Sequence, residues 1–132
     1  MANKFLLVGF WLPFVLCTYL AFAPSPPESV FRISDVILHG IAFSYLTFAL
    51  SLCYFPKRFW VPAAWMLGYA LSIEAIQSLQ PERSAELQDI WVDIGGIAIG
   101  GVLIRHLTDA VRTVVDRVTG LLARRSKFPD KN

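Results

Sequence analysis

Seven polar residues stand in or beside long apolar stretches, and their types could support chemistry. They are Asp35, His39, Glu74, Gln77, Arg83, Asp89 and Asp93. Six of them form three pairs spaced three or four residues apart, a spacing that places both members on one face of a helix. A carboxylate and an imidazole can act as general acid and base, while carboxylates and a guanidinium can bind a polar head group. The neighbouring carboxylates Asp89 and Asp93 are also candidate ligands for a divalent metal ion.

The elements that position these residues are predicted to be membrane helices. The chain has 132 residues, 55% of them hydrophobic and 17% charged, and its mean hydropathy is +0.53. This composition excludes an ordinary soluble domain, a disordered chain and a nucleic-acid binder with a broad basic face. Apolar stretches of about 20 residues predict helices over about 5–23, 36–54, 60–79 and 86–105. We therefore expect a single all-α domain, a four-transmembrane-helix bundle.

The charges of the connecting segments predict the orientation. Lys and Arg are concentrated at the N-terminus (Lys4), between the second and third helices (Lys57, Arg58) and in the C-terminal tail. The positive-inside rule therefore predicts an N-in/C-in topology in the cytoplasmic membrane of a bacterium. An alternative interpretation of the first helix is a secretory signal peptide ending at residues 21–23, but Pro24 would then occupy an unfavourable cleavage position.

This topology brings the polar residues to one depth. His39, Glu74 and Asp93 each lie about 6–8 Å from the outer end of their helix. Ionisable groups cost on the order of 2–3 kcal/mol each in hydrocarbon, so a functional cluster is the first hypothesis for them. Structural roles are the alternative for several others, since Asp35 and Asp89 could act at helix starts and Gln77 could join two helices. Glu74 and Asp93 lie too deep for capping.

Two segments carry a family resemblance. Residues 34–43 read SDVILHGIAF, and residues 68–100 read GYALSIEAIQSLQPERSAELQDIWVDIGGIAIG. Their motif resembles that of the VanZ-like membrane protein family, named for a teicoplanin-resistance accessory protein. The resemblance implies these motif positions: Asp35, His39, Glu74, Gln77, Pro81, Arg83, Ser84 and Asp89. The chain departs from the family pattern at Val36, usually Lys, and at Asp93, usually Asn. The resemblance implies a small bacterial envelope protein, linked in some members to glycopeptide resistance, and supplies no established reaction.

Glycines and a basic tail complete the pattern. Gly96 and Gly100 form a small-x-x-x-small face that could pack within one chain or across a homodimer, and the first is favoured because Asp93 must also face inward. Apolar residues then recur at helical spacing, opposite several arginines, over about 106–125. This predicts a cytoplasmic amphipathic helix on anionic lipid, with a solvated helix packed on a partner as the alternative.

Three functions are compatible with these residues. The first is an accessory protein whose outward-facing pocket binds a lipid head group or cell-wall precursor. The second is an outer-leaflet enzyme acting on a lipid-linked or wall substrate, with His39 and Glu74 as the acid–base pair. The third is a proton-coupled carrier, the least supported with four helices. We favour the first because no residue resembles an activated nucleophile. No organic cofactor and no nucleic-acid partner are indicated.

Overall fold

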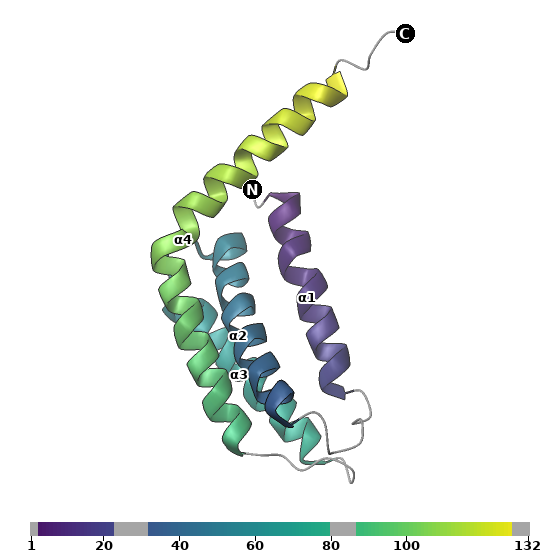
Figure 1. Ribbon diagram of the computed structural model, residues 1–132, viewed down its shortest axis with the longest axis vertical. Coiled ribbons are helices and arrows are strands. Elements are labelled where there is room, and N and C mark those ends of the chain that lie inside the picture. The colour runs from purple at the N-terminus through teal and green to yellow at the C-terminus, as the bar shows by residue number, and fades with distance from the viewer. Residues whose placement is uncertain (1–2, 23–31, 80–86, 128–132) are drawn as a thin grey trace.

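The computed structural model describes residues 3–22, 32–79 and 87–127, with side chains described over 3–22, 36–79 and 89–122. These residues form four helices, α1 (Lys4–Phe22), α2 (Arg32–Tyr54), α3 (Trp60–Gln77) and α4 (Leu87–Lys127). In the described ranges the chain contains no strand, and the helices run alternately up and down (Figure 1). The all-α prediction is therefore confirmed.

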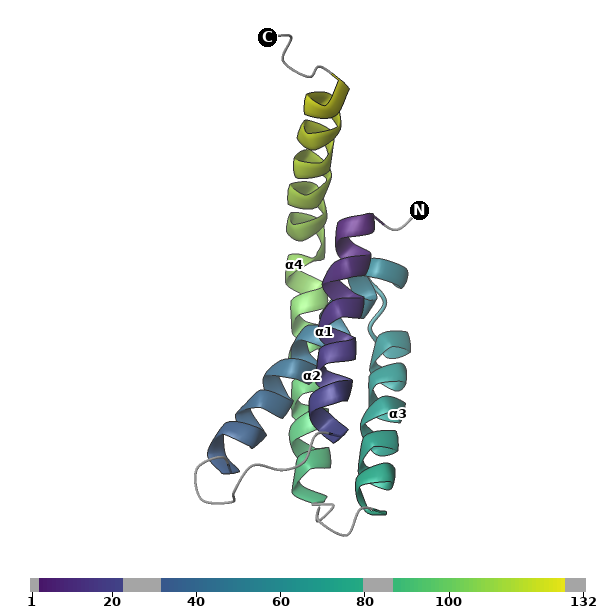
Figure 2. The same ribbon diagram turned by 90° about the vertical axis from the view of Figure 1, so that its right-hand side faces the viewer.

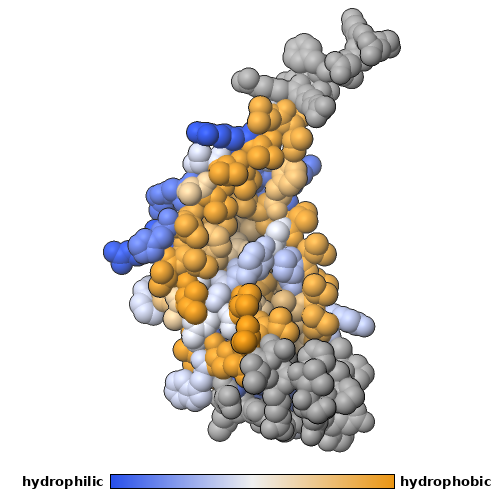
Figure 3. Space-filling view, viewed as in Figure 1, coloured by the Kyte–Doolittle hydropathy of each residue, from blue (hydrophilic) through white to orange (hydrophobic). Residues whose placement is uncertain are grey.

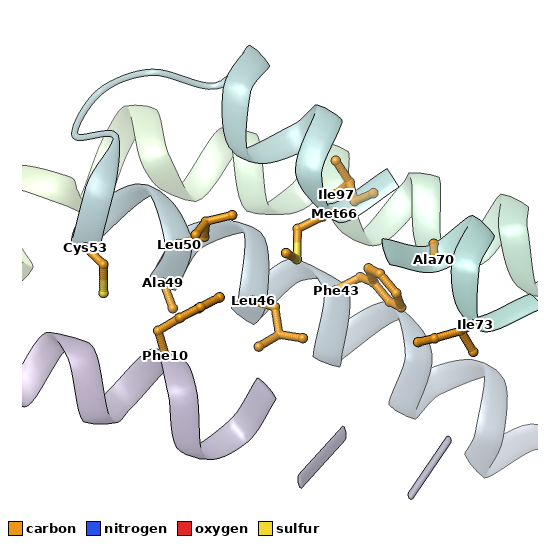
Figure 4. Close-up of a cluster of buried hydrophobic side chains, with 10 residues drawn as sticks. All are labelled: Phe10, Phe43, Leu46, Ala49, Leu50, Cys53, Met66, Ala70, Ile73 and Ile97. Carbon is orange, nitrogen blue, oxygen red and sulfur yellow. The ribbon is translucent and has the colours of Figure 1, made fainter. Parts of the chain in front are cut away.

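Helix α2 occupies the centre of the bundle. It packs against α4 along most of its length and contacts both α1 and α3 (Figure 2). Its inward residues include Leu46, Thr47 and Ser51, which are almost fully buried. The apolar core combines residues of all four helices (Figure 4): Phe10, Phe43, Leu46, Ala49, Leu50, Cys53, Met66, Ala70, Ile73 and Ile97. The buried hydroxyls of α2 do not disturb this core, because they donate to backbone carbonyls, as Thr47 does to Phe43 at 2.6 Å.

Glycines set the close approach of α2 and α4. A Cβ atom built on Gly96 would lie 2.5 Å from the carbonyl oxygen of Gly40, and one on Gly100 would lie 2.7 Å from that of Ser44. The helix backbones are therefore in direct contact at these positions. The Gly96/Gly100 face packs within one chain, which was the favoured interpretation of the sequence.

Three helical segments among the described residues are long and apolar enough to cross a membrane: Lys4–Phe22, Val36–Tyr54 and Asp89–Leu122. Helix α3, predicted as a full span over 60–79, ends at Gln77 and is not among them, because Glu74 and Gln77 lower the hydropathy of a short helix. Even so, α3 runs alongside the other helices between the two ends of the bundle (Figure 2). The surface viewed in Figure 3 is broadly apolar, as expected of a face in contact with lipid.

The fourth predicted span and the amphipathic helix form one element. Helix α4 is a continuous helix of 41 residues, about 60 Å long, and not two helices over 86–105 and 106–125. No proline interrupts it, and the change in apolar pattern after Ile104 changes which face is buried without ending the helix. Its second half leans across the start of α1 (Figure 1). We call residues 105–122 the extension.

Candidate functional site

Two residues from different helices meet at the end of the bundle where α2 and α4 begin, which we call the polar end. His39 Nδ1 lies 3.2 Å from Asp93 Oδ1. Asp93 is only 2% exposed, and the His39 side chain is 21% exposed. The contact follows from the helix packing, because His39 directly precedes Gly40 and Asp93 lies three residues before Gly96, the two glycines of the close crossing.

The chemistry of this pair follows from its atoms. An ionised carboxylate only accepts hydrogen bonds, so Nδ1 of the imidazole donates to Asp93. The second ring nitrogen, Nε2, is then an acceptor in the neutral imidazole. A carboxylate that accepts from Nδ1 in this way also fixes the tautomer and the orientation of the ring. The pair is therefore suited to accept and return a proton, or to bind a hydrogen-bond donor.

Helix α3 presents two more polar side chains near this end. Glu74 and Gln77 are 7% and 5% exposed and share the inward face of α3 with Ala70 and Ile73. The Gln77 amide Nε2 donates to the carbonyl oxygen of Ala21 at 2.8 Å. Ala21 is in the last turn of α1, where carbonyls have no partner within the helix. Gln77 therefore joins α3 to α1, the interhelical role that the sequence left open for it.

Tyr69 is part of this neighbourhood and was not identified from the sequence. Its hydroxyl lies 2.7 Å from Thr18 Oγ1. Because Thr18 donates its own proton to the Phe14 carbonyl, Tyr69 is the donor to Thr18. The available signal was its hydroxyl within the apolar stretch 60–79, because a buried tyrosine hydroxyl usually finds a hydrogen-bond partner.

An aromatic wall connects these groups. The ring centroid of Phe43 lies 6.4 Å from that of His39 and 5.9 Å from that of Tyr69. The Tyr69 ring in turn lies 4.7 Å from Phe14 of α1. Phe43 therefore lies beside the His39 ring, and an apolar neighbour of this kind strengthens the electrostatic component of a hydrogen bond.

The other predicted site residues are placed less fully. Arg83, Pro81 and Ser84 lie outside the described residues, as does the side chain of Asp35, whose backbone is in the first turn of α2. Asp89 is half-buried in the first turn of α4, one turn before Asp93. Over the described ranges, no three His, Cys, Asp or Glu side chains gather closely enough to hold a metal ion.

Apolar helices around a half-buried imidazole and a buried carboxylate define a multi-pass helical membrane protein. The family model for VanZ/LLP1 matches residues 5–108, well over half of the chain. The chain therefore belongs to the VanZ/LLP1 family, whose usual association is teicoplanin resistance. No curated protein and no solved structure matches it. The family match covers every predicted site residue and ends within the extension, at Thr108.

Proposed function

We propose that the chain is an accessory protein of the cell envelope that binds the polar head group of a lipid or cell-wall precursor at the polar end. The observation that carries the proposal is the contact between half-buried His39 and buried Asp93. An ionisable group in a membrane helix costs on the order of 2–3 kcal/mol, and apolar residues would pack the same space without that cost. A ligand whose binding needs these groups explains why they are present.

The proposed ligand donates hydrogen bonds. Among the described side chains at the polar end, Glu74, Asp89 and Asp93 supply carboxylates and His39 supplies one imidazole. Carboxylates accept bonds from sugar hydroxyls and from amines, and charge-assisted bonds of this kind are about twice as strong as neutral ones. Arg83 is proposed to pair with an anionic group of the same ligand, such as a phosphate.

The proposed topology places this site outside the cytoplasm. The opposite end of the bundle, which we call the basic end, carries Lys4, Lys57, Arg58 and Arg105. Basic residues remain on the cytoplasmic side. Both termini lie there only if the number of crossings is even, so α3 is proposed to cross together with the three candidate spans. The contact of Gln77 with Ala21 supports a crossing by α3, because it joins the end of α3 to the end of α1.

Ligand binding by the purified protein in lipid nanodiscs tests the proposal. Native mass spectrometry would compare lipid II, undecaprenyl phosphate and phosphatidylglycerol as ligands of the parent chain, Asp93→Asn and Glu74→Gln. We expect the parent to bind one of the first two preferentially. A lost charge-assisted hydrogen bond costs about 1.5–3 kcal/mol, so each variant should bind about 10- to 150-fold more weakly.

The matched control is Asp109→Asn, which removes an exposed carboxylate of the same helix at the basic end. It should bind within about twofold of the parent, because its contact with Lys57 is exposed and contributes about 0–1 kcal/mol to stability. Equal affinity of all four proteins for every ligand would reject the pocket.

An outer-leaflet enzyme is the second candidate, favoured by the orientation of His39. Its Nε2 would act as general base and Glu74 as the partner acid, on a lipid-linked or wall substrate. In this case His39→Ala and Glu74→Gln should abolish turnover of the bound ligand while its affinity changes little. Graded affinity losses without any turnover by the parent favour the accessory role instead.

A further inference from the structure

The extension of α4 carries an exposed apolar stripe. Five of its large apolar side chains are exposed, among them Val114 at 59% and Leu121 at 67%. Four of the five recur at steps of seven, four and three: Leu107, Val114, Val118 and Leu121. A different face of the extension packs against the bundle, since Thr108 is buried and Val115 is half-buried. The stripe is therefore additional to the surface that holds the extension in place.

Contacts with the bundle keep the extension near the membrane boundary. The amide Nδ2 of Asn3 donates to Thr119 Oγ1 at 3.3 Å, and Arg112 Nη2 donates to the Leu52 carbonyl at 2.7 Å. Asn3 directly precedes α1, a candidate membrane span that begins at Lys4. Thr119 lies about 22 Å along α4 from Ile104 and yet is level with the point where α1 begins. The extension therefore crosses the basic end obliquely and does not project straight away from it (Figure 1).

The charge of this segment favours an anionic partner. Arg105 and Arg117 are exposed, and Arg117 lies within one turn of Val114 and Leu121 of the stripe. Of the two acidic residues in the extension, Asp109 already forms an ion pair with Lys57 at 3.0 Å. Arg124, Arg125 and Lys127 follow in the same helix. The hydrophilic side chains gather along one edge, beside an apolar surface (Figure 3).

A second copy of the chain fits this stripe less well than lipid does. Leu107, Val111, Val114, Val118 and Leu121 follow the alternating steps of four and three of a coiled-coil seam. The next position of that seam is Arg125. A symmetric parallel pair would therefore bring two guanidinium groups together at the seam, which opposes association.

We propose that the extension is an interfacial anchor whose apolar stripe enters the anionic leaflet at the basic end, with arginines at the phospholipid head groups. Helices with one apolar and one basic face bind such surfaces, and each nearby basic residue contributes about 1 kcal/mol. The anchor is independent of the proposed function of the polar end. It would hold α1 and α4 at a fixed depth in the membrane.

A fluorescent label tests this placement in the full chain. Cys17 and Cys53 would be replaced by Ala, and an environment-sensitive NBD group attached at Val118→Cys on the stripe or at Thr113→Cys on the exposed polar face. Both proteins would be reconstituted in phosphatidylcholine vesicles with and without 30% phosphatidylglycerol, some of it brominated. We expect the label at 118 to be blue-shifted and quenched by brominated phosphatidylglycerol, and the label at 113 to remain in water.

Charge removal supplies the second measurement. Arg117→Gln in the Val118→Cys protein should reduce the preference for phosphatidylglycerol over phosphatidylcholine in quenching by about fivefold, the equivalent of 1 kcal/mol. Label signals that are equal at 118 and 113 would overturn the proposal. A blue shift at 118 without quenching by brominated lipid would also overturn it, in favour of a second protein copy on the stripe. If replacing both cysteines lowers the melting temperature of the chain, the labels are attached instead to chains that keep them. Cys53 is buried and should not react. The signal from Cys17 is measured on the chain without an added cysteine and subtracted.

Discussion

Replacement of Gly96 by Ala tests the helix packing that positions the candidate site. The added methyl carbon would lie 2.5 Å from the Gly40 carbonyl oxygen and 3.1 Å from the Phe43 Cβ atom, whereas ordinary contacts are 3.4–4 Å. The obstacle is mainly backbone, which cannot rotate away as a side chain can. Helices α2 and α4 must therefore separate locally by about 1 Å, a distance that follows from the two contact distances.

Gly95 provides the matched control for this substitution. A Cβ atom on Gly95 has no neighbour within 4 Å. Both substitutions gain the same helix propensity, about 1 kcal/mol for Gly to Ala, so this contribution cancels in their difference. What remains is the cost of overpacking, about 1–3 kcal/mol. Gly96→Ala should therefore be less stable than Gly95→Ala by about that amount.

Unfolding of both variants in mixed micelles measures the difference. The fraction of SDS would be raised and unfolding followed by the fluorescence of the four tryptophans. Gly96→Ala should unfold at a lower SDS fraction than Gly95→Ala and should bind the head-group ligand more weakly, because separation of the helices lengthens the contact of His39 with Asp93. Coincident unfolding curves for the two variants would refute the close approach of α2 and α4.

Three further predictions follow from individual contacts. Arg112→Gln should destabilise the chain by about 1.5–3 kcal/mol, because it removes the charged hydrogen bond to the Leu52 carbonyl. Lys57→Gln removes only an exposed ion pair and should cost about 0–1 kcal/mol. The same unfolding assay measures both, and equal losses would show that the bond of Arg112 does not stabilise the fold. Asp93→Asn should fold with nearly parental stability, because its amide oxygen still accepts a hydrogen bond from the imidazole. Asp93→Ala should lower the free energy of unfolding by about 1–3 kcal/mol. Thermal unfolding in detergent compares the two variants, and a large loss of stability in Asp93→Asn would show that the charge itself stabilises the fold. Tyr69→Phe should lower the free energy of unfolding by about 0.5–1.5 kcal/mol, because it removes one hydrogen bond to α1. An unchanged unfolding midpoint would show that this hydrogen bond does not stabilise the bundle.

The helices could be predicted largely from hydropathy and prolines. The predicted first and second spans, 5–23 and 36–54, agree with α1 and with the C-terminal part of α2, because a run of apolar residues and a following proline define both. The length of α4 could not be predicted in this way. After Ile104 the apolar pattern changes from a membrane helix to an amphipathic one, and hydropathy does not reveal that the backbone continues without a break.

The common level of His39 and Asp93 could be predicted from the sequence because membrane helices fix depth, whereas their direct contact could not. Each residue advances a helix by about 1.5 Å, so residues at matching distances from helix ends lie at one level. The distance from a helix end does not show how each helix is rotated about its own axis, and therefore which side chains face one another. The Tyr69–Thr18 bond and the choice of Gln77 for the Ala21 carbonyl depend on rotation, and only the packed helices determine it.

The placement of the candidate site on packed backbone has a consequence for its chemistry. Gly40 and Gly96 set the distance between α2 and α4, and the residues beside them carry the imidazole and the carboxylate. The backbone contact requires only that position 96 lacks a side chain, since a Cβ atom on Gly40 would make an ordinary contact with Val92 at 3.5 Å. Position 93 can therefore carry Asp, as here, or the Asn that the family resemblance implies, with the helices unchanged. Because that exchange alters the charge of a nearly fully buried group and leaves its shape, position 93 is where we expect ligand preference to differ between family members.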